Sequence, residues 1–294
     1  MKAVIRSFRV PFLVLTPVCV GLGVVAAWLT GAAIHWGDAL VALGGALCAH
    51  MSVNAFNEYF DFRSGLDAQT QRTPFSGGSG SLVERPTAAV SVLNSALLTL
   101  AVTVLAGGYV ILRHGWGILP IGLLGVVIIL TYTHWINRLP WVCLVAPGVA
   151  FGPLMVMGTQ YALAGEFTSL AALISLVPFF LVNNLLLLNQ YPDREADAAV
   201  GRRHIPIALG LSASNVLYGG FLLAAALTVG LGVVGDRLPA LALLALVPML
   251  AAVFTLWGAI RYANDIPRLI PFMGANVLAV VTAPLVLAVT LAVG

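Results

Sequence analysis

The sequence predicts an all-α protein, a bundle of nine helices that spans a membrane. Of its 294 residues 60% are hydrophobic and 9% are charged, and the mean hydropathy is +1.01. The apolar residues come in repeated runs of about 20, and a helix of that length crosses the roughly 30 Å hydrocarbon core of a bilayer. The charged residues fall between these runs. This composition excludes a soluble globular domain, and nothing in the sequence indicates a nucleic-acid partner.

The nine spans are expected at residues 10–30, 38–60, 88–112, 116–136, 141–163, 168–191, 209–233, 238–260 and 268–292. The first run follows Lys2, Arg6 and Arg9, as the apolar part of a signal peptide would. It is long for that purpose and it opens a membrane bundle, so we expect it to be retained. The three cysteines lie in apolar segments without CxxC spacing, which favours buried apolar side chains over disulfides or metal ligands.

The arginines and lysine predict the orientation. If the N-terminus is cytoplasmic, twelve of the fourteen basic residues fall on the cytoplasmic side, and only Arg113 and Arg237 fall outside. This positive-inside asymmetry places the protein in the cell (inner) membrane with its N-terminus in the cytoplasm. Eight of the eleven acids share that side, although acids do not follow the rule. Their concentration therefore needs a separate cause.

Two acidic clusters supply that cause. The first contains Asn57, Asp61 and Asp67 after the second span, and the second contains Asn189, Asp193 and Asp197 after the sixth. Members four residues apart stack on one face of a helix. The two links that carry the clusters, 61–87 and 192–208, are also the longest, which is typical of functional lids. The offset of four spans indicates a parallel internal repeat, spans 2–5 and 6–9, within a single domain of residues 1–294.

Carboxylates and Asn amides offer only oxygen ligands, which suit Mg²⁺. Mg²⁺ keeps some of its waters and commonly bridges to phosphate. Guanidinium groups for a diphosphate are available nearby, at Arg72, Arg138, Arg202 and Arg203. Acids, arginines and an apolar bundle together predict a ligand with a diphosphate head and a hydrocarbon tail. Solvated helix ends are the alternative for the acids, and positive-inside anchoring is the alternative for the arginines.

These residues resemble the UbiA superfamily of intramembrane prenyltransferases along nearly the whole chain. That family has nine helices and two Asp-rich motifs, N-x3-D with a further Asp and D-x3-D, matched here at 57, 61, 67, 193 and 197. Its Tyr and basic residue at the end of the fourth helix resemble Tyr132 and Arg138. The stretch from Asn57 to Asp67 looks most like the 1,4-dihydroxy-2-naphthoate polyprenyltransferases of menaquinone synthesis, where the third ligand follows the second by six residues.

The resemblance implies Mg²⁺-dependent transfer of a polyprenyl group from its diphosphate to an aromatic acceptor, with Asp61, Asp193 and Tyr132 in catalytic roles. The two motifs, with Asn57 and Asn189, would hold the metal. Transfer to another aromatic or lipid acceptor and cyclisation of the prenyl chain are the alternatives within the enzyme class. A secondary transporter that uses the acids as ion-coupling sites is the alternative outside it.

Some polar residues lie deeper in the apolar runs. His50 stands two helical turns before Asn57, and Asn54 lies between them; we expect both to line the substrate cavity. Asn184 is expected there too, with hydrogen bonding between helices as the alternative. For His50 the alternative is a structural, hydrogen-bonded histidine. The sequence does not indicate an oligomeric state.

Overall fold

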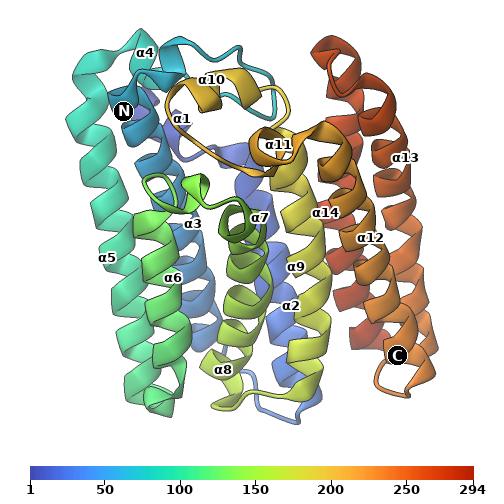
Figure 1. Ribbon diagram of the computed structural model, residues 1–294. Coiled ribbons are helices and arrows are strands. Elements are labelled where there is room, and N and C mark those ends of the chain that lie inside the picture. The colour runs from blue at the N-terminus through green and yellow to red at the C-terminus, as the bar shows by residue number, and fades with distance from the viewer.

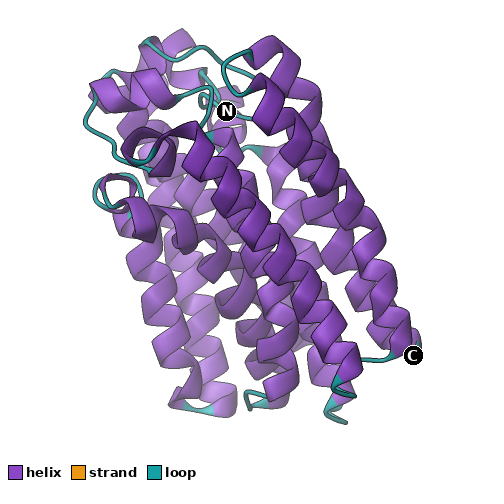
Figure 2. Ribbon diagram, turned by 45° about the vertical axis from the view of Figure 1, so that its right-hand side comes forward, coloured by secondary structure: helices purple, strands orange, loops and turns teal.

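The computed structural model describes residues 1–294, and all of its regular structure is helical. Nine long helices run along the bundle (Figures 1 and 2): α2 (Leu15–Leu29), α3 (Trp36–Ser64), α5 (Ala89–His114), α6 (Leu119–Thr131), α7 (Pro140–Val149), α9 (Ser169–Asn189), α12 (Gly210–Val234), α13 (Leu246–Tyr262) and α14 (Ile266–Val293). The short helices α1 (Lys2–Ser7), α4 (Ser81–Glu84), α10 (Arg194–Ala199) and α11 (Ile205–Ala208) gather at one end, hereafter the site end. The other end carries α8 (Gly158–Ala164).

Single turns complete the elements. The 3₁₀ turns are η1 (Val10–Val14), η2 (Leu66–Ala68), η3 (Pro86–Ala88), η4 (Trp116–Ile118), η5 (Ile136–Arg138) and η7 (Ala240–Ala245). A π-helical stretch, η6 (Ala150–Met157), joins α7 to α8. It contains Pro153, and Pro147 lies six residues earlier in α7. Because proline lacks an N–H, these two residues loosen the regular hydrogen-bond ladder there.

Eight helical stretches are long and apolar enough to cross a membrane: Val10–Leu29, Trp36–Ser64, Pro86–His114, Pro140–Ala164, Ser169–Asn189, Gly210–Val234, Ala240–Tyr262 and Ile266–Val293. The expectation of nine such spans was wrong at the fourth. Residues 116–136 do not form one long helix. An apolar helix runs only from Trp116 to Thr131, after which the chain turns and brings Thr133 and Asn137 to the site.

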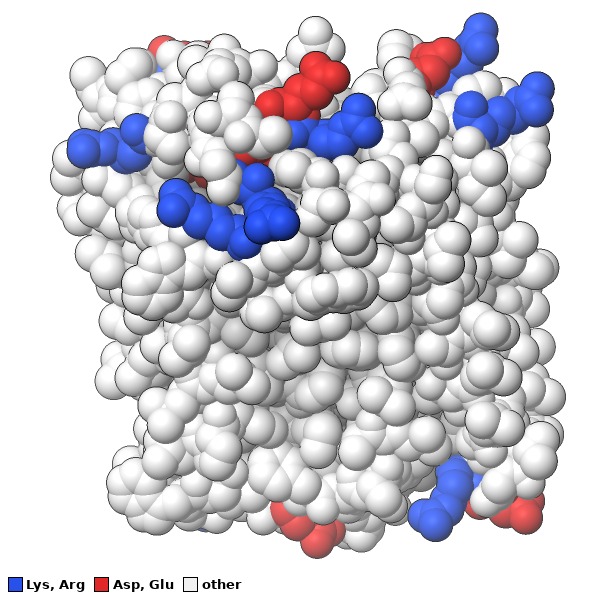
Figure 3. All heavy atoms as spheres, viewed as in Figure 1, with Lys and Arg blue, Asp and Glu red and all other residues white.

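The tryptophans mark the two ends of the apolar surface. All six are at least half exposed. Trp28, Trp36 and Trp116 lie at or beside helix ends away from the site end, whereas Trp135, Trp141 and Trp257 lie near the site end. Tryptophan favours the boundary between hydrocarbon and headgroups. Figure 3 agrees, because the charged side chains visible on that face lie at its two ends and the middle is uncharged.

The main core is organised around α9, which packs against α7, η6, α12 and α14. Small residues permit close approach: a side chain at Gly148 would collide with the backbone oxygen of Phe179 on α9. Polar groups in this core pair between helices. Asn183 Oδ1 accepts from Gly148 N at 2.7 Å, and Asn184 Nδ2 donates to the backbone oxygen of Tyr218 at 2.9 Å. Such bonds fix the register of helices in an apolar surrounding.

Two helix ends set the positions of the acidic motifs. α3 ends at Ser64, and Gly65 turns the chain with a positive φ of 78°, a conformation that glycine adopts without steric cost. α9 ends at Asn189, three residues before Pro192. Asn189 and Asp193 therefore do not share a continuous helix, contrary to the expected stacking. Asp193 is instead the N-cap residue of α10, and Asp197 lies within α10.

Candidate active site

The two acidic motifs converge on one cavity at the site end, hereafter the polar cavity. Its volume is about 100 Å³. Asn57 and Asp61 reach it from α3, one turn apart, and Asp67 reaches it from η2. Asn189, Asp193 and Asp197 reach it from α9 and α10. The structure thus brings all six expected metal-binding residues together although 132 positions separate Asn57 from Asn189 in the chain.

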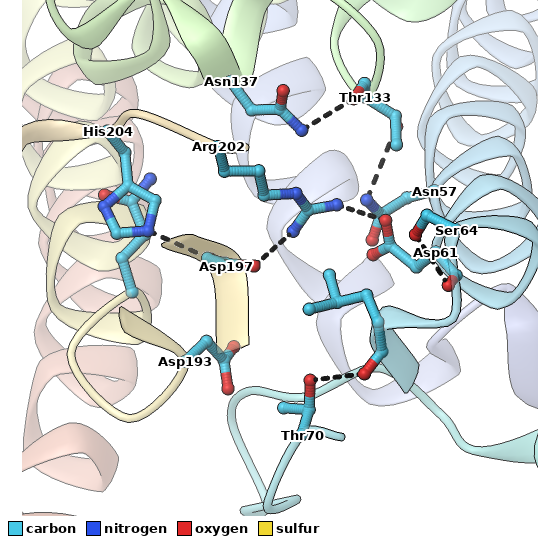
Figure 4. A network of polar contacts seen from close by, with 12 residues as sticks. Asn57, Asp61, Ser64, Thr70, Thr133, Asn137, Asp193, Asp197, Arg202 and His204 are labelled. Carbon is cyan, nitrogen blue, oxygen red and sulfur yellow. Dashed lines mark hydrogen bonds and ion pairs between the residues drawn. The ribbon is translucent and has the colours of Figure 1, made fainter. Parts of the chain in front are cut away.

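Arg202 lies between the motifs (Figure 4). Its Nη1 donates to Asp197 Oδ1 at 2.9 Å, and its Nη2 donates to Asp61 Oδ1. His204 Nε2 lies 3.0 Å from the other oxygen of Asp197. The Arg202 side chain is 15% exposed, and both aspartates are more deeply buried. Without this guanidinium, two buried carboxylates would face each other uncompensated, so Arg202 offsets their repulsion.

The remaining acids of the cavity have no such partner. Burial raises the pKa of Asp67 to about 7, with a further contribution from the neighbouring carboxylates of Glu58 and Asp61. Burial likewise raises the pKa of Asp193 to about 7, and Asp197 adds to the effect. Both shifts show that too little positive charge lies near these carboxylates to stabilise their ionised forms. A bound cation would supply that positive charge.

Four buried oxygens of residues that line the cavity make no hydrogen bond: Asp67 Oδ2, Asn137 Oδ1, Asn189 Oδ1 and Asp193 Oδ1. Unpaired buried oxygens are costly unless something binds them. All are hard ligands of the kind that Mg²⁺ prefers. No three acids or histidines are grouped closely enough to hold an ion in the present arrangement, and Arg202 occupies Asp61 and Asp197. The donor set therefore fits a divalent cation, provided that Arg202 releases at least one aspartate.

The segment Thr73–Gly80, hereafter the lid, closes the polar cavity. Gly77 N donates to Asp193 Oδ2 at 3.0 Å, so the lid after α3 contacts the motif after α9. Gly78 has a φ of +71°, and a Cβ there would come within 2.8 Å of Asp67 Oδ1. Arg72 Nη2 donates to the backbone oxygen of Asp67 at 3.1 Å. The lid can lie this close to the carboxylates only because glycines occupy these positions.

Glu58 anchors the end of the lid. Its fully buried carboxylate accepts hydrogen bonds from Ser79 N and Oγ at 2.9 and 2.5 Å, and from Ser81 N and Oγ at 3.1 and 3.0 Å. The sequence indicated Glu58 only as one acid among several. Its sole local signal is its place between Asn57 and Asp61, on a different face of the helix.

Arg9 was also missed, because positive-inside anchoring already accounts for an arginine at that position. It lines the polar cavity and donates from Nη2 to Asn57 Oδ1 at 3.0 Å. Its backbone is left-handed, with φ 51° and ψ 52°, which is uncommon for a residue other than glycine. This turn between α1 and η1 directs a cation into the site. Only the nearby Pro11 hints at it in the sequence.

Two apolar spaces adjoin the polar cavity. The apolar cavity, of about 300 Å³, lies between α3, α6, α7 and η6 and shares Arg9, Asn57, Tyr132 and Leu186 with the polar cavity. The second apolar cavity, of about 90 Å³, lies between η1, α9 and α14. His50 and Asn54 line both apolar spaces. Asn54 Nδ2 also donates to the backbone oxygen of Phe8 at 3.0 Å.

Other expected site residues lie elsewhere. Arg138 lines a separate polar cleft of about 430 Å³, which shares Asp61, Asn137 and Arg202 with the polar cavity. Arg203 is exposed, and its backbone N–H donates to Asn137 O at 2.8 Å. Asn184 lines none of these spaces; its bond to α12 matches the helix-to-helix alternative. Arg72, directly before the lid, is exposed. The three cysteines are free, as expected.

Solved structures of other proteins share this fold. A UbiA homologue from Aeropyrum pernix K1 superimposes with a TM-score of 0.72 at 18% identity, covering 95% of this chain and 97% of that one. A homologue from Archaeoglobus fulgidus, solved with DMAPP and Mg²⁺, gives a TM-score of 0.66 at 14% identity over 96% and 98% of the two chains. At these identities the likeness establishes the fold.

Sequence relatives narrow the family. The 1,4-dihydroxy-2-naphthoate octaprenyltransferase of Bacillus subtilis (strain 168) is 29% identical over 68% of this chain, which spans 64% of that relative. The protein of the same name from Mycobacterium tuberculosis (strain ATCC 25618 / H37Rv) is 30% identical over 71% of this chain and 69% of its own length. The sequence model of the UbiA prenyltransferase family matches residues 14–273 of this chain. The chain is therefore a membrane-embedded member of the UbiA prenyltransferase family.

Proposed function

We propose that this protein transfers a polyprenyl group from its diphosphate to an aromatic acceptor, 1,4-dihydroxy-2-naphthoate. The observation that carries the proposal is the convergence of two acidic motifs on one buried cavity that opens into apolar space. A diphosphate needs the first environment and a hydrocarbon tail needs the second. The acceptor follows from the two relatives of that name and from the spacing of Asp61 and Asp67.

Mg²⁺ is the proposed cofactor, and when bound it would neutralise the diphosphate and stabilise it as a leaving group. Asp67, Asp193 and Asn189 offer it their unpaired oxygens. Asn57, Asp61 and Asp197 complete the set. The DMAPP and Mg²⁺ bound by the Archaeoglobus homologue support this assignment.

Arg202 and Arg9 have different proposed roles in binding the substrate. Arg202 carries a buried positive charge that partly compensates the two carboxylates of Asp61 and Asp197. When cations take over that role, the guanidinium becomes free to donate to a diphosphate oxygen. Arg9 stands at the junction of the polar and apolar cavities, where the head and the tail of the substrate meet.

The lid and the apolar walls protect the reaction. Breaking the bond between the prenyl carbon and the diphosphate leaves an allylic cation that water would quench. The lid covers the polar cavity through the Gly77–Asp193 bond, and side chains such as Phe151, Leu154 and Leu186 line the space beyond. An electron-rich aromatic carbon can then attack in a space with little water.

Charge placement argues against a transporter. Ion-coupling acids of a transporter are expected near the middle of the membrane, within reach of both sides. Here every acid of the candidate site lies at one end of the bundle, and the middle of the face in Figure 3 carries no charge. The excess of arginine at the site end supports a cytoplasmic orientation for that end.

The test is product mass spectrometry. Membranes containing the protein would receive geranylgeranyl diphosphate, Mg²⁺ and a panel of quinone precursors, and a parallel sample would receive EDTA. The proposal predicts a prenylated naphthoquinol, absent with EDTA and absent from Asp61→Asn and Asp193→Asn membranes. Prenylation of a different acceptor would replace the proposed acceptor. A cyclised hydrocarbon formed without any acceptor would replace the proposed transfer with cyclisation. No Mg²⁺-dependent product of any kind would reject prenyl transfer.

A further inference from the structure

His50 is held in one orientation on α3. Its Nδ1 lies 2.9 Å from Thr16 Oγ1 of α2, and its ring meets the Phe151 ring edge-on with centroids 4.9 Å apart. The residue is 8% exposed. Its other ring nitrogen, Nε2, makes no hydrogen bond with the protein, yet it is not among the buried atoms that lack a partner. Nε2 therefore keeps access to open space.

That space is the meeting point of the two apolar cavities. Arg9, His50, Asn54, Phe151 and Leu186 line both of them. A prenyl tail and an aromatic ring must occupy apolar space on either side of the reacting carbon. Whichever cavity receives the tail, a ring in the other one lies against the residues that the two cavities share, and His50 is one of these.

His50 is also the only base available there. Neither apolar cavity has a carboxylate among its lining residues. The other ionisable groups are Arg9, which stays protonated, and Tyr132, a phenol. Prenylation of a hydroxylated ring speeds up when the hydroxyl gives up its proton, because the oxygen then donates electrons to the ring. A neutral imidazole within reach of the ring is suited to take that proton.

We propose that His50 is the proton acceptor for the aromatic acceptor's hydroxyl, and that Thr16 is its positioning residue. This inference rests on the proposed function. This role requires the tautomer in which Nδ1–H donates to Thr16 Oγ1 and the Nε2 lone pair faces the cavity. The acceptor class is then a hydroxylated aromatic whose hydroxyl lies beside the carbon that is alkylated or opposite to it.

The O–H bond breaks and its proton moves to His50 Nε2, while the oxygen electron pair shifts into the ring. The ring carbon bonds to the prenyl carbon, and the electrons of the breaking C–O bond leave with the diphosphate. When the alkylated carbon is the one that carries the carboxylate of 1,4-dihydroxy-2-naphthoate, it then loses that group as CO₂, and the oxygen regains its proton from the imidazolium. With an acceptor that carries hydrogen at that carbon, the hydrogen leaves as a proton instead, and one proton is released per turnover.

The experiment compares His50→Ala with the wild type in single-turnover prenyl transfer, using acceptors of graded hydroxyl acidity. We expect the rate to fall about 10²–10⁴-fold with a weakly acidic acceptor. The loss should shrink as the hydroxyl becomes more acidic, and added imidazole should restore part of the rate. Binding of a prenyl thiodiphosphate, which involves no proton transfer, shows whether the variant still folds and holds the donor.

Two further variants separate chemistry from packing. Thr16→Val should show a smaller loss with the same dependence on acceptor acidity, because the imidazole is still present but less well oriented. Thr103→Val removes a hydroxyl from another wall of the apolar cavity. Its rate should depend on the acidity of the acceptor hydroxyl as the wild-type rate does.

The outcomes are distinct. An equal loss for every acceptor in His50→Ala, without rescue by imidazole, would reduce His50 to a packing residue and overturn the inference. A wild-type rate in that variant would overturn it too. If the wild-type protein prenylates no acceptor, the proposed function itself fails, whatever the variants do.

Discussion

Arg202→Gln tests whether the arginine and the metal ions serve the same carboxylates. The substitution removes one buried positive charge from between Asp61 and Asp197. The three side chains are 15%, 7% and 5% exposed, so solvent screens the pair poorly. Breaking a buried ion pair from one side costs about 3–5 kcal/mol, and we expect a loss of that order in the metal-free protein.

The assay is thermal unfolding in detergent, with EDTA or with excess Mg²⁺. In EDTA the variant should unfold well below the wild type. In Mg²⁺ the difference in stability between variant and wild type should shrink, because the cation neutralises the carboxylates that no longer have the Arg202 guanidinium as a partner. Arg203→Gln is the matched control: that side chain is exposed, and its loss should cost less than about 0.5 kcal/mol. An equal penalty in EDTA and in Mg²⁺ would refute the idea that arginine and metal compete for one place.

Four further predictions concern the same cavity and its lid. The raised pKa values of Asp67 and Asp193 favour their neutral forms in the fold, so the metal-free protein should gain stability as the pH falls from 8 to 6 and lose it as the pH rises through about 7. Apparent Mg²⁺ affinity should change the opposite way, weakening below pH 7 because ligands must lose their protons, and a Mg²⁺ titration of activity at each pH measures this. Gly78→Ala should lower turnover and cost about 1–3 kcal/mol, since the new Cβ is strained and crowds Asp67; unchanged kinetics would contradict the lid position. Glu58→Gln should speed proteolysis or hydrogen exchange of the lid while leaving the helices protected, because the amide cannot accept all four bonds.

The sequence was sufficient for the parts of the fold that depend on local pattern. Apolar runs and turn residues predicted most helices to within a few residues, and the spacing of Asn57 and Asp61 correctly placed both on one helix. The sixth expected span, 168–191, is α9. These features depend on periodicity and hydropathy, which are local properties.

Features that depend on contacts across the bundle were not predictable in the same way. The helix expected at 116–136 ends at Thr131. The polar residues Thr133 and Asn137 then contact the site, a long-range arrangement that hydropathy does not report. The bridge from Arg202 to Asp61 joins residues 141 positions apart through a link with no periodicity. The roles of Arg9 and Glu58 arise from the same long-range contacts.

The Asn184 expectation shows the limit of reasoning from burial alone. A polar residue in an apolar span needs a partner, and the sequence could not distinguish a substrate from a neighbouring helix. The structure supplies a backbone oxygen of α12, which accepts from Asn184 Nδ2, whereas Asn184 Oδ1 has no hydrogen-bond partner in the protein. Asn276 on α14 donates from Nδ2 to the backbone oxygen of Asn184 at 3.4 Å. The internal repeat of spans 2–5 and 6–9 stays a prediction.

The most direct test is Mn²⁺ binding, followed by electron paramagnetic resonance in the presence of a prenyl thiodiphosphate that cannot react. If both motifs hold cations around one diphosphate, wild-type protein should bind Mn²⁺ tightly only when the diphosphate is present. Asp61→Asn alone or Asp193→Asn alone should then abolish that dependence. Undiminished, diphosphate-dependent Mn²⁺ binding in either variant would contradict a shared site.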